Sequence, residues 1–308
     1  MSLKQVLEAY ELLSGASVSG EQVAGVLRRR GIADVSVERA EGEAAATDFL
    51  SCVVPGADAG KPALGVIGRL GGLGARPAAI GLVSDADGAI TALAVALKLA
   101  DMAAQGDVLP GPVRIHTHIC PRAATRAHQP VPMMRSPLPM REMMAREVHR
   151  ETAVILSVDT TRGNRFINQR GVALTPVAKE GYLLRLPDVM LDVMGWVSGE
   201  LRRVLPLTTQ DVTPSDNGLW HVNSIMQPST ATKAPVVGVA LTAQTVVPGS
   251  ATGASNAYDI DVAARYCVEI AKLFGAGKCS FYDALEWAEL QRRYGSLARL
   301  QATGEDSA

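Results

Sequence analysis

Two nearly uninterrupted apolar segments constrain the fold of this chain more than any other feature of its sequence. They are Ala153–Asp159, which ends in an acid, and Pro235–Thr242. Neither segment alternates apolar with polar residues, and such runs are typical of strands that are covered on both faces. Helical periodicity precedes them in Asp87–Ala104 and follows in Tyr258–Phe274. The sequence therefore predicts a three-layer α/β (αβα) fold, with a mostly parallel central sheet between two layers of helices.

Strand and helix signals continue along the rest of the chain without an internal repeat or a low-complexity linker. We expect one domain over residues 1–302, with two N-terminal helices in residues 1–31 as an appendage, and a disordered tail over residues 303–308. The further strands that we expect are Val35–Ala40, Asp48–Pro55, Leu64–Arg69, Ile80–Ser84, Val113–Cys120, Gly171–Thr175 and Val204–Thr208, and the further helices are Pro187–Ser198 and Asp283–Tyr294.

The charge balance and the hydropathy exclude several classes of function. The net charge of -1 gives no basis for binding nucleic acid or an anionic membrane surface. No apolar run approaches the roughly 20 residues that span a bilayer, and the amphipathic start, Met1–Tyr10, is unlike a signal peptide. The four cysteines form no CxxC pair, which argues against a zinc ribbon. We expect a cytoplasmic protein whose partner is a small-molecule or peptide-like ligand.

Two aspartates follow apolar segments at positions where a parallel sheet presents its carboxyl edge. Asp85 stands between the expected strand Ile80–Ser84 and a helix, and Asp159 closes the central strand. Open α/β sheets place their ligand sites at this edge. A carboxylate there either binds a cation, lies in the turn before a helix, or pairs with an arginine, which for Asp159 is Arg162 or Arg165.

His116, His118 and Cys120 alternate along another expected strand. Residues two apart in a strand share a face, so the three side chains project to the same side. Two imidazoles and a thiol on one face can hold a metal ion. The alternative is that His116 is a hydrogen-bonded core histidine, with only His118 and Cys120 near the sheet edge.

Two polar loops supply further candidates for a binding site. Asp216 and Asn217 precede Trp220, where they either contact a ligand or cap a helix. Thr252 and Ser255 lie in a loop of small residues after the second buried strand. Hydroxyl groups and backbone amides in such a loop either bind an anion or turn the chain.

The order of these segments resembles the core of the zinc aminopeptidases and related co-catalytic metallopeptidases, including the tetrahedral glutamyl-aminopeptidase type. Asp85, followed by a helix of small residues, matches the metal-bridging aspartate of that family. Asp159 matches a further metal-binding aspartate at the end of a central strand. The resemblance implies a metallopeptidase-like (phosphorylase/hydrolase-like) fold and a divalent metal, zinc or manganese.

The chain departs from that family at three of its functional positions. Arg69 stands where the family has a histidine ligand, and Cys120–Arg122 stand where it has a pair of glutamates. No histidine occurs between Val246 and Asp261, where the family has its last ligand. The whole chain also resembles an uncharacterised bacterial family of similar length through Ile67–Gly72 and His118–Pro121, and this second resemblance implies no function.

Two functional hypotheses follow from these residues. In the first, the protein is a divergent hydrolase of an amide or small peptide-like compound, and Asp85, His118 and Asp159 hold one metal ion. In the second, it is a non-catalytic protein that binds a small ligand, and arginines replace the metals. We take the first as the working hypothesis, because many polar residues converge on one edge. Its catalytic candidates are Cys120, as a nucleophile, and Arg122, and its substrate-binding candidates are Arg69, Arg162, Asp216, Asn217, Thr252 and Ser255.

The assembly state is predicted only indirectly. The peptidase-like scaffold and the methionine-rich loop around Met133–Met144 lead us to expect a homo-oligomer.

Overall fold

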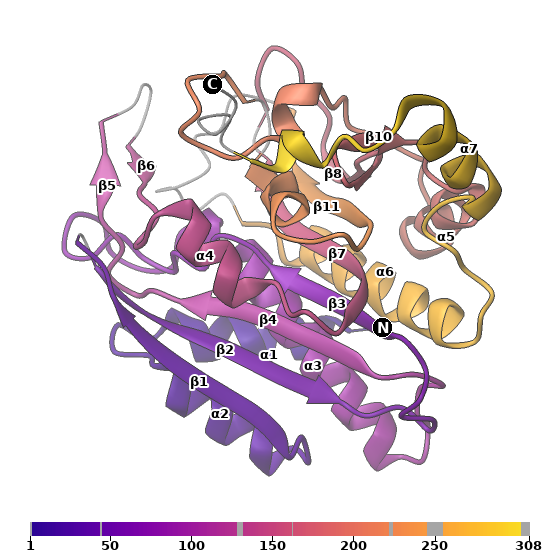
Figure 1. The fold of residues 1–308 in the computed structure, drawn as a ribbon. Coiled ribbons are helices and arrows are strands. Elements are labelled where there is room, and N and C mark those ends of the chain that lie inside the picture. The colour runs from indigo at the N-terminus through magenta and orange to yellow at the C-terminus, as the bar shows by residue number, and fades with distance from the viewer. Residues whose placement is uncertain are drawn as a thin grey trace.

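One large sheet organises the protein (Figure 1). The computed structural model describes residues 2–43, 45–127, 132–161, 163–221, 224–244 and 255–302, so the expected tail over residues 303–308 lies outside the described residues. Within the described ranges, nine strands form the sheet in the order β1-β2-β4-β3-β7-β11-β9-β10, and β8 pairs with β11. The strands are β1 (Asp34–Glu41), β2 (Ala46–Val54), β3 (Ala63–Gly68), β4 (Val113–Ile119), β7 (Thr152–Thr161), β8 (Gly171–Leu174), β9 (Val177–Lys179), β10 (Tyr182–Leu184) and β11 (Val236–Thr242), and a separate antiparallel pair comprises β5 (Thr125–Arg126) and β6 (Met133–Met134).

The four central strands, β4, β3, β7 and β11, are parallel. Antiparallel strands flank them: β2 pairs with β4 on one side, and β8 and β9 pair with β11 on the other. Because parallel strands end at the same edge of a sheet, residues that follow or close β3, β4 and β7 come together there. This arrangement confirms the predicted α/β fold with a mostly parallel centre.

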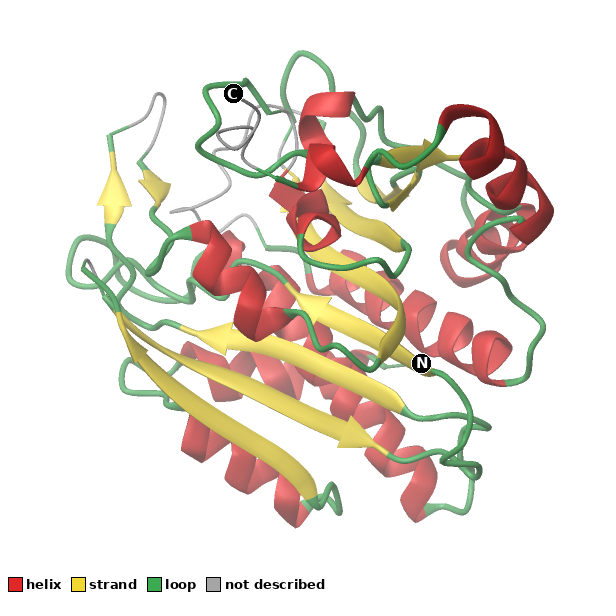
Figure 2. Ribbon diagram, in the orientation of Figure 1, coloured by secondary structure: helices red, strands yellow, loops and turns green. Residues whose placement is uncertain are grey.

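Helices cover both faces of the sheet (Figure 2). On one face, α3 and α6 pack directly on the central strands, and α1 packs on both of these helices. On the other face lie α4 and the 3-10 segment η3, which contacts β7 and β11. The helices are α1 (Leu3–Ser14), α2 (Gly20–Arg29), α3 (Asp87–Ala104), α4 (Met140–Glu147), α5 (Asp188–Ser198), α6 (Ala257–Gly275) and α7 (Ala284–Tyr294), and the 3-10 segments are η1 (Ser84–Ala86), η2 (Thr209–Val212), η3 (Ser224–Thr230) and η4 (Ala298–Gln301).

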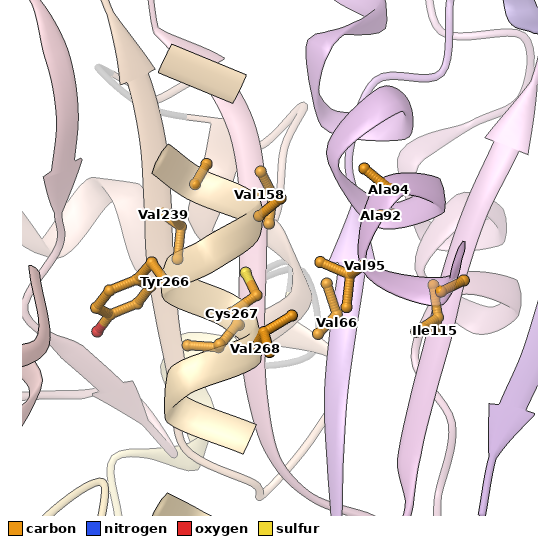
Figure 3. Packing of buried hydrophobic residues seen from close by; sticks show 14 of the residues in the cluster. Val66, Ala92, Ala94, Val95, Ile115, Val158, Val239, Tyr266, Cys267 and Val268 are labelled. Atoms are coloured by element: carbon orange, nitrogen blue, oxygen red, sulfur yellow. The ribbon is translucent and has the colours of Figure 1, made fainter. Parts of the chain in front are cut away.

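Alternate residues of the central strands enter two different cores. Along β7, Leu156 and Val158 join the core under α3 and α6, whereas Ile155 joins the core under η3. Figure 3 shows Val158 next to Val239 of the neighbouring strand β11, and Val66 of β3 next to Val95 of α3. This two-sided burial explains why the segment reads as continuously apolar. By the same alternation, Asp159 lies on the η3 side of the sheet.

Two strand predictions are wrong. Residues 80–83 are irregular, and Gly81 has a φ of 90°, which is incompatible with an extended strand. Both edges of the preceding strand, β3, are already paired, with β4 and β7, so residues 80–84 cannot pair with it. The expected strand Val204–Thr208 reduces to a single bridge between Val204 and Leu174, because Pro206 has no amide hydrogen for a ladder.

No helix in the described ranges combines the length and the apolar character that crossing a bilayer requires.

Candidate functional site

A cavity of about 840 Å³ opens at the carboxyl edge of the central strands, on the side of α4 and η3. Four of the predicted site residues line it: Arg69, Asp85, His118 and Asp216. The rest of its lining comes from the turn after β3, from the β5–β6 pair, from the loop between β6 and α4, from α4, and from η3 with the segment that precedes it. The sheet therefore brings together residues that are far apart in sequence, as the strand order requires.

A buried ion pair forms one wall of the cavity. Arg69 directly follows β3, and its Nη1 donates to Oε2 of Glu147, the last residue of α4, at 2.5 Å. Both side chains are 1% exposed or less. The sulfur atoms of Met140 and Met144 lie 3.6 and 3.7 Å from the guanidinium nitrogens. Arg69 Nε and Glu147 Oε1 have no hydrogen-bond partner among the described residues.

Asp159 lies close enough to Arg69 for the two charges to interact. It accepts hydrogen bonds from the Ser224 hydroxyl at 3.0 Å and from the backbone N–H of Thr160 at 2.7 Å. Burial raises its pKa from 3.8 to about 6, against the lowering effect of Arg69 and of these hydrogen bonds, and the negative charge of Glu147 raises the pKa further. Asp159 does not itself line the cavity, but its partner Ser224 does.

Both ring nitrogens of His118 are occupied by the protein. Nε2 accepts from the backbone N–H of Gly71 at 2.9 Å, so the proton is on Nδ1, which donates to Thr47 Oγ1 at 2.9 Å. Burial, with a smaller effect of Arg69, lowers the pKa of His118 to about 3, so the ring is neutral at pH 7. A metal ion needs a free nitrogen lone pair. In this arrangement His118 offers no free lone pair to a metal ion, and its assignment as a ligand stays a prediction.

The remaining acidic groups do not complete a metal site. In the part of the chain that the structure describes, no three His, Cys, Asp or Glu side chains are grouped so that they could hold a metal ion. The cationic Arg69 is close enough to influence Asp159, Glu147 and His118 electrostatically. The donor set described here therefore does not fit the zinc or manganese ion that the peptidase resemblance implies.

Comparison with known proteins identifies the family. The family model of DUF1177, described as a protein of unknown function, matches residues 38–304. The chain belongs to this family. This result agrees with the predicted resemblance to a family without assigned activity.

Solved structures show what the DUF1177 fold is similar to. Cytosol aminopeptidase from Coxiella burnetii has a TM-score of 0.51 and 13% identity, over 86% of this chain and 68% of that chain. A Zn-dependent exopeptidase from Parabacteroides distasonis gives 0.48 and 10%, over 88% and 96%, and an Acidobacteriales glutaminyl cyclase gives 0.49 and 10%, over 90% and 94%. No curated protein matches the sequence. The first of these similarities supports an aminopeptidase-like fold for the DUF1177 protein and, at this identity, nothing beyond the fold.

The DUF1177 structure also places Cys120 and Arg122 away from the cavity lining. Cys120 is fully buried and its Sγ donates to the backbone oxygen of Ala46 at 3.4 Å. Burial raises the pKa of Cys120 to about 11; the hydrogen bond from the Arg122 backbone N–H opposes this rise, and Asp85 and Asp48 add smaller increases. Arg122 is exposed on the surface. A buried, protonated thiol is a poor nucleophile, so the geometry does not favour the predicted catalytic roles, which stay predictions.

We expect the thiols of the native protein to be unreactive. All four cysteines are buried. At pH 7.5, alkylation of Cys120 by iodoacetamide should be more than about a hundredfold slower than that of a small free thiol. Mass spectrometry of the native protein, compared with the protein in urea, measures this ratio. Rapid and selective labelling of Cys120 in the native state would contradict the burial described here.

Two other predicted site residues have structural partners, and two more cannot be placed. Asn217 closes its own loop by accepting from the Leu219 N–H at 3.0 Å, and it does not line the cavity. The helix that we expected after Asp216 does not form, because Asp216 and Gly218 both have positive φ. The Ser255 hydroxyl donates to the Asp87 carboxylate, at the start of α3. Arg162 and Thr252 lie outside the described residues.

Sequence reasoning missed Glu147. The signal was the spacing of α4, in which Met140, Met143, Met144 and Glu147 recur at the 3.6-residue helical period. An acid that occupies one position of an otherwise apolar helix face predicts a buried carboxylate with a cationic partner.

Glycines let the backbone approach the site closely. A Cβ atom on Gly71 would lie 1.7 Å from the backbone oxygen of His118. One on Gly72 would lie 2.8 Å from Asp85 Oδ2 and 2.9 Å from Met134 Cε. Leu70, between Arg69 and these glycines, has a φ of 54°, which few side chains tolerate. The turn after β3 is thus shaped so that Arg69 points into the wall of the cavity.

Proposed function

We propose that this DUF1177 protein binds a small peptide-like molecule in the cavity without a metal ion. In this proposal, Arg69 provides the positive charge that a metal ion provides in a metallopeptidase. The observation that carries the proposal is the position of the Arg69 guanidinium, which is paired with Glu147 and influences Asp159 and His118. The predicted alternative, a non-catalytic protein in which arginines replace metals, is therefore favoured over the hydrolase.

Electrostatics supports this choice. An arginine side chain stays protonated at every physiological pH. A divalent cation bound beside it would meet a fixed positive charge in an environment that is shielded from water, where repulsion between like charges is strong. The buried guanidinium therefore satisfies the acidic groups and disfavours a metal ion at the same time.

The cavity suits a small ligand with some polar groups. Its volume of about 840 Å³ falls in the range of small-molecule sites. At its wall, Arg69 Nε and Glu147 Oε1 are buried and have no partner among the described residues, and such atoms are rarely left unsatisfied in a native protein. Both atoms are closed off from solvent, so the ion pair is a fixed part of the cavity wall.

Three described groups that the hydrolase hypothesis assigns to the chemistry, His118, Cys120 and Asp159, are engaged or buried within the protein. His118 uses both nitrogens within the protein, and the Cys120 thiol is buried and protonated. Asp159 is 1% exposed and accepts two hydrogen bonds from its own surroundings. A general base must reach the proton that it removes, so binding without turnover is the better supported function.

A metal-loading experiment tests this proposal. Protein stripped with a chelator and reloaded with zinc or manganese should retain well below one equivalent per chain by elemental analysis, in the wild type and in Asp85→Asn alike. The apoprotein should be stabilised by members of a dipeptide and acyl-amide panel in a thermal-shift assay, and mass spectrometry should recover those compounds intact. Stoichiometric metal that is lost in Asp85→Asn, or cleavage of a panel member, would overturn the proposal in favour of the hydrolase.

A further inference from the structure

Two arginines, one in β5 and one directly after β6, line the cavity from the same side. Arg126 is paired with Met133, and the backbone N–H of Arg135 donates to the oxygen of Ala124 at 2.7 Å. Residues that are directly opposite each other in an antiparallel pair share a face, so Arg126 and Met133 point to the same side. Arg135 is two residues after Met133 and points to that side too, which makes Arg126 and Arg135 diagonal neighbours. Such neighbours are roughly 7–8 Å apart, a separation that two arginine side chains can bridge through one anion.

Neither arginine is neutralised by the protein. Both are exposed, both line the cavity, and no ion pair involves either of them within the described ranges. By contrast, Arg146 on the nearby helix α4 pairs with Glu38. Two adjacent positive charges without a counter-ion repel each other, and an anion bound between them would relieve this repulsion.

Apolar side chains surround these charges. Four methionines line the cavity, and Trp220 lines it from the opposite segment. The Trp220 ring lies 5.6 Å from that of Phe166, and the two rings are 68% and 57% exposed. Methionine adapts to the shape of an apolar partner, and exposed aromatic rings at a cavity are typical of ligand contacts. The lining methionines are Met133, Met134, Met140 and Met143.

We propose that the ligand of this cavity is an amphipathic monocarboxylate, whose carboxylate binds Arg126 and Arg135 and whose apolar or aromatic body lies against the methionines and Trp220. This inference rests on the proposed function and specifies its ligand. A monoanion fits better than a dianion such as a phosphate, because the Asp216 carboxylate also lines the cavity and would repel the second charge.

Calorimetric titration of the apoprotein tests this inference with three probes that share one tail: 3-phenylpropionate, its primary amide and 2-phenylethyl phosphate. The carboxylate should bind more tightly than the amide and the phosphate. The double variant Arg126→Gln/Arg135→Gln should weaken carboxylate binding by roughly tenfold to a hundredfold, the range expected for charged hydrogen bonds. The matched control, Arg141→Gln, changes an exposed arginine of α4 that does not line the cavity and should bind like the wild type.

The outcomes separate this inference from the proposed function. If the amide binds as tightly as the carboxylate, if the phosphate binds more tightly, or if the double variant binds like the control, the monocarboxylate assignment is wrong and the metal-free cavity remains. If no probe binds while dipeptides still stabilise the protein, the assignment is equally wrong. Stoichiometric metal or cleavage of a panel compound overturns the proposed function itself.

Discussion

Replacing Arg69 with methionine should destabilise the protein by about 3–5 kcal/mol, the usual cost of removing one partner from a buried ion pair. The variant leaves the Glu147 carboxylate, and the nearby Asp159, without the cation that compensates their burial. Methionine fills a comparable volume next to Met140 and Met144, so lost packing contributes little. Urea unfolding at pH 7.5 measures the loss as a change in the free energy of unfolding.

A double variant separates the charge from the packing. Arg69→Met/Glu147→Met removes both members of the pair and should recover most of the stability that Arg69→Met loses, because no unpaired charge remains at that position. Arg202→Met provides the control, since its ion pair with Asp192 is largely exposed and should contribute less than about 1 kcal/mol. A loss in Arg69→Met no larger than that of the control would show that the buried pair is unimportant for stability.

Lowering the pH should strongly destabilise the protein at pH values that are still well above the pKa of ordinary carboxylates. Burial is the main cause that lowers the pKa of His116 from 6.5 to about 4, with smaller effects of His149 and Arg114. Burial and Arg69 likewise lower that of His118 to about 3. Below pH 6.5 the unfolded chain takes up protons at these two residues while the folded chain does not, so stability falls as the pH falls.

The contribution of Asp159 to stability changes with pH in the opposite direction to that of the histidines. Because its pKa is raised from 3.8 to about 6, the folded state binds this proton more tightly, and its contribution to stability increases as the pH falls from 6 to 3.8. The two histidines outweigh Asp159, and these three groups together give a net loss between pH 7.5 and pH 5 on the order of 3 kcal/mol. Burial also raises the pKa of Glu147, which reduces this loss.

The urea concentrations at the unfolding midpoint, measured at pH 7.5 and at pH 5, test the sign of the histidine contribution and of the Asp159 contribution. His118→Gln should reduce the difference between pH 7.5 and pH 5, whereas Asp159→Asn should increase it by about 1 kcal/mol or more, since it removes the opposing contribution. Equal midpoints for the wild type at both pH values would contradict the neutral, buried state of the histidines.

The fold could be predicted because its central strands are buried on both sides. Burial on two faces makes Ala153–Val158 apolar at every position but one, and this signal does not depend on distant residues. The segment before Asp85 was misleading, since its apolar residues resemble a strand although Ile80 is 99% exposed. Whether such a segment pairs depends on whether the sheet has a free neighbour position, and a local pattern does not contain that information.

The site could be predicted in position but not in chemistry. Parallel strands end at the same edge of a sheet, which explains why Arg69, Asp85 and His118 line one cavity. The state of each side chain depends on partners that are distant in sequence. Burial keeps His118 neutral, Thr47 and Gly71 occupy its two ring nitrogens, and Glu147 pairs with Arg69. Only the tertiary structure brings these partners together.

The two-sided burial of β7 limits how this family can vary in length. Because Ile155 and Leu156 enter different cores, one residue inserted into the strand would exchange their environments and turn Asp159 away from Ser224. Such a change cannot be compensated by a neighbouring substitution. We therefore expect natural insertions and deletions to accumulate in surface loops away from the cavity and to be excluded from the strands that carry the site.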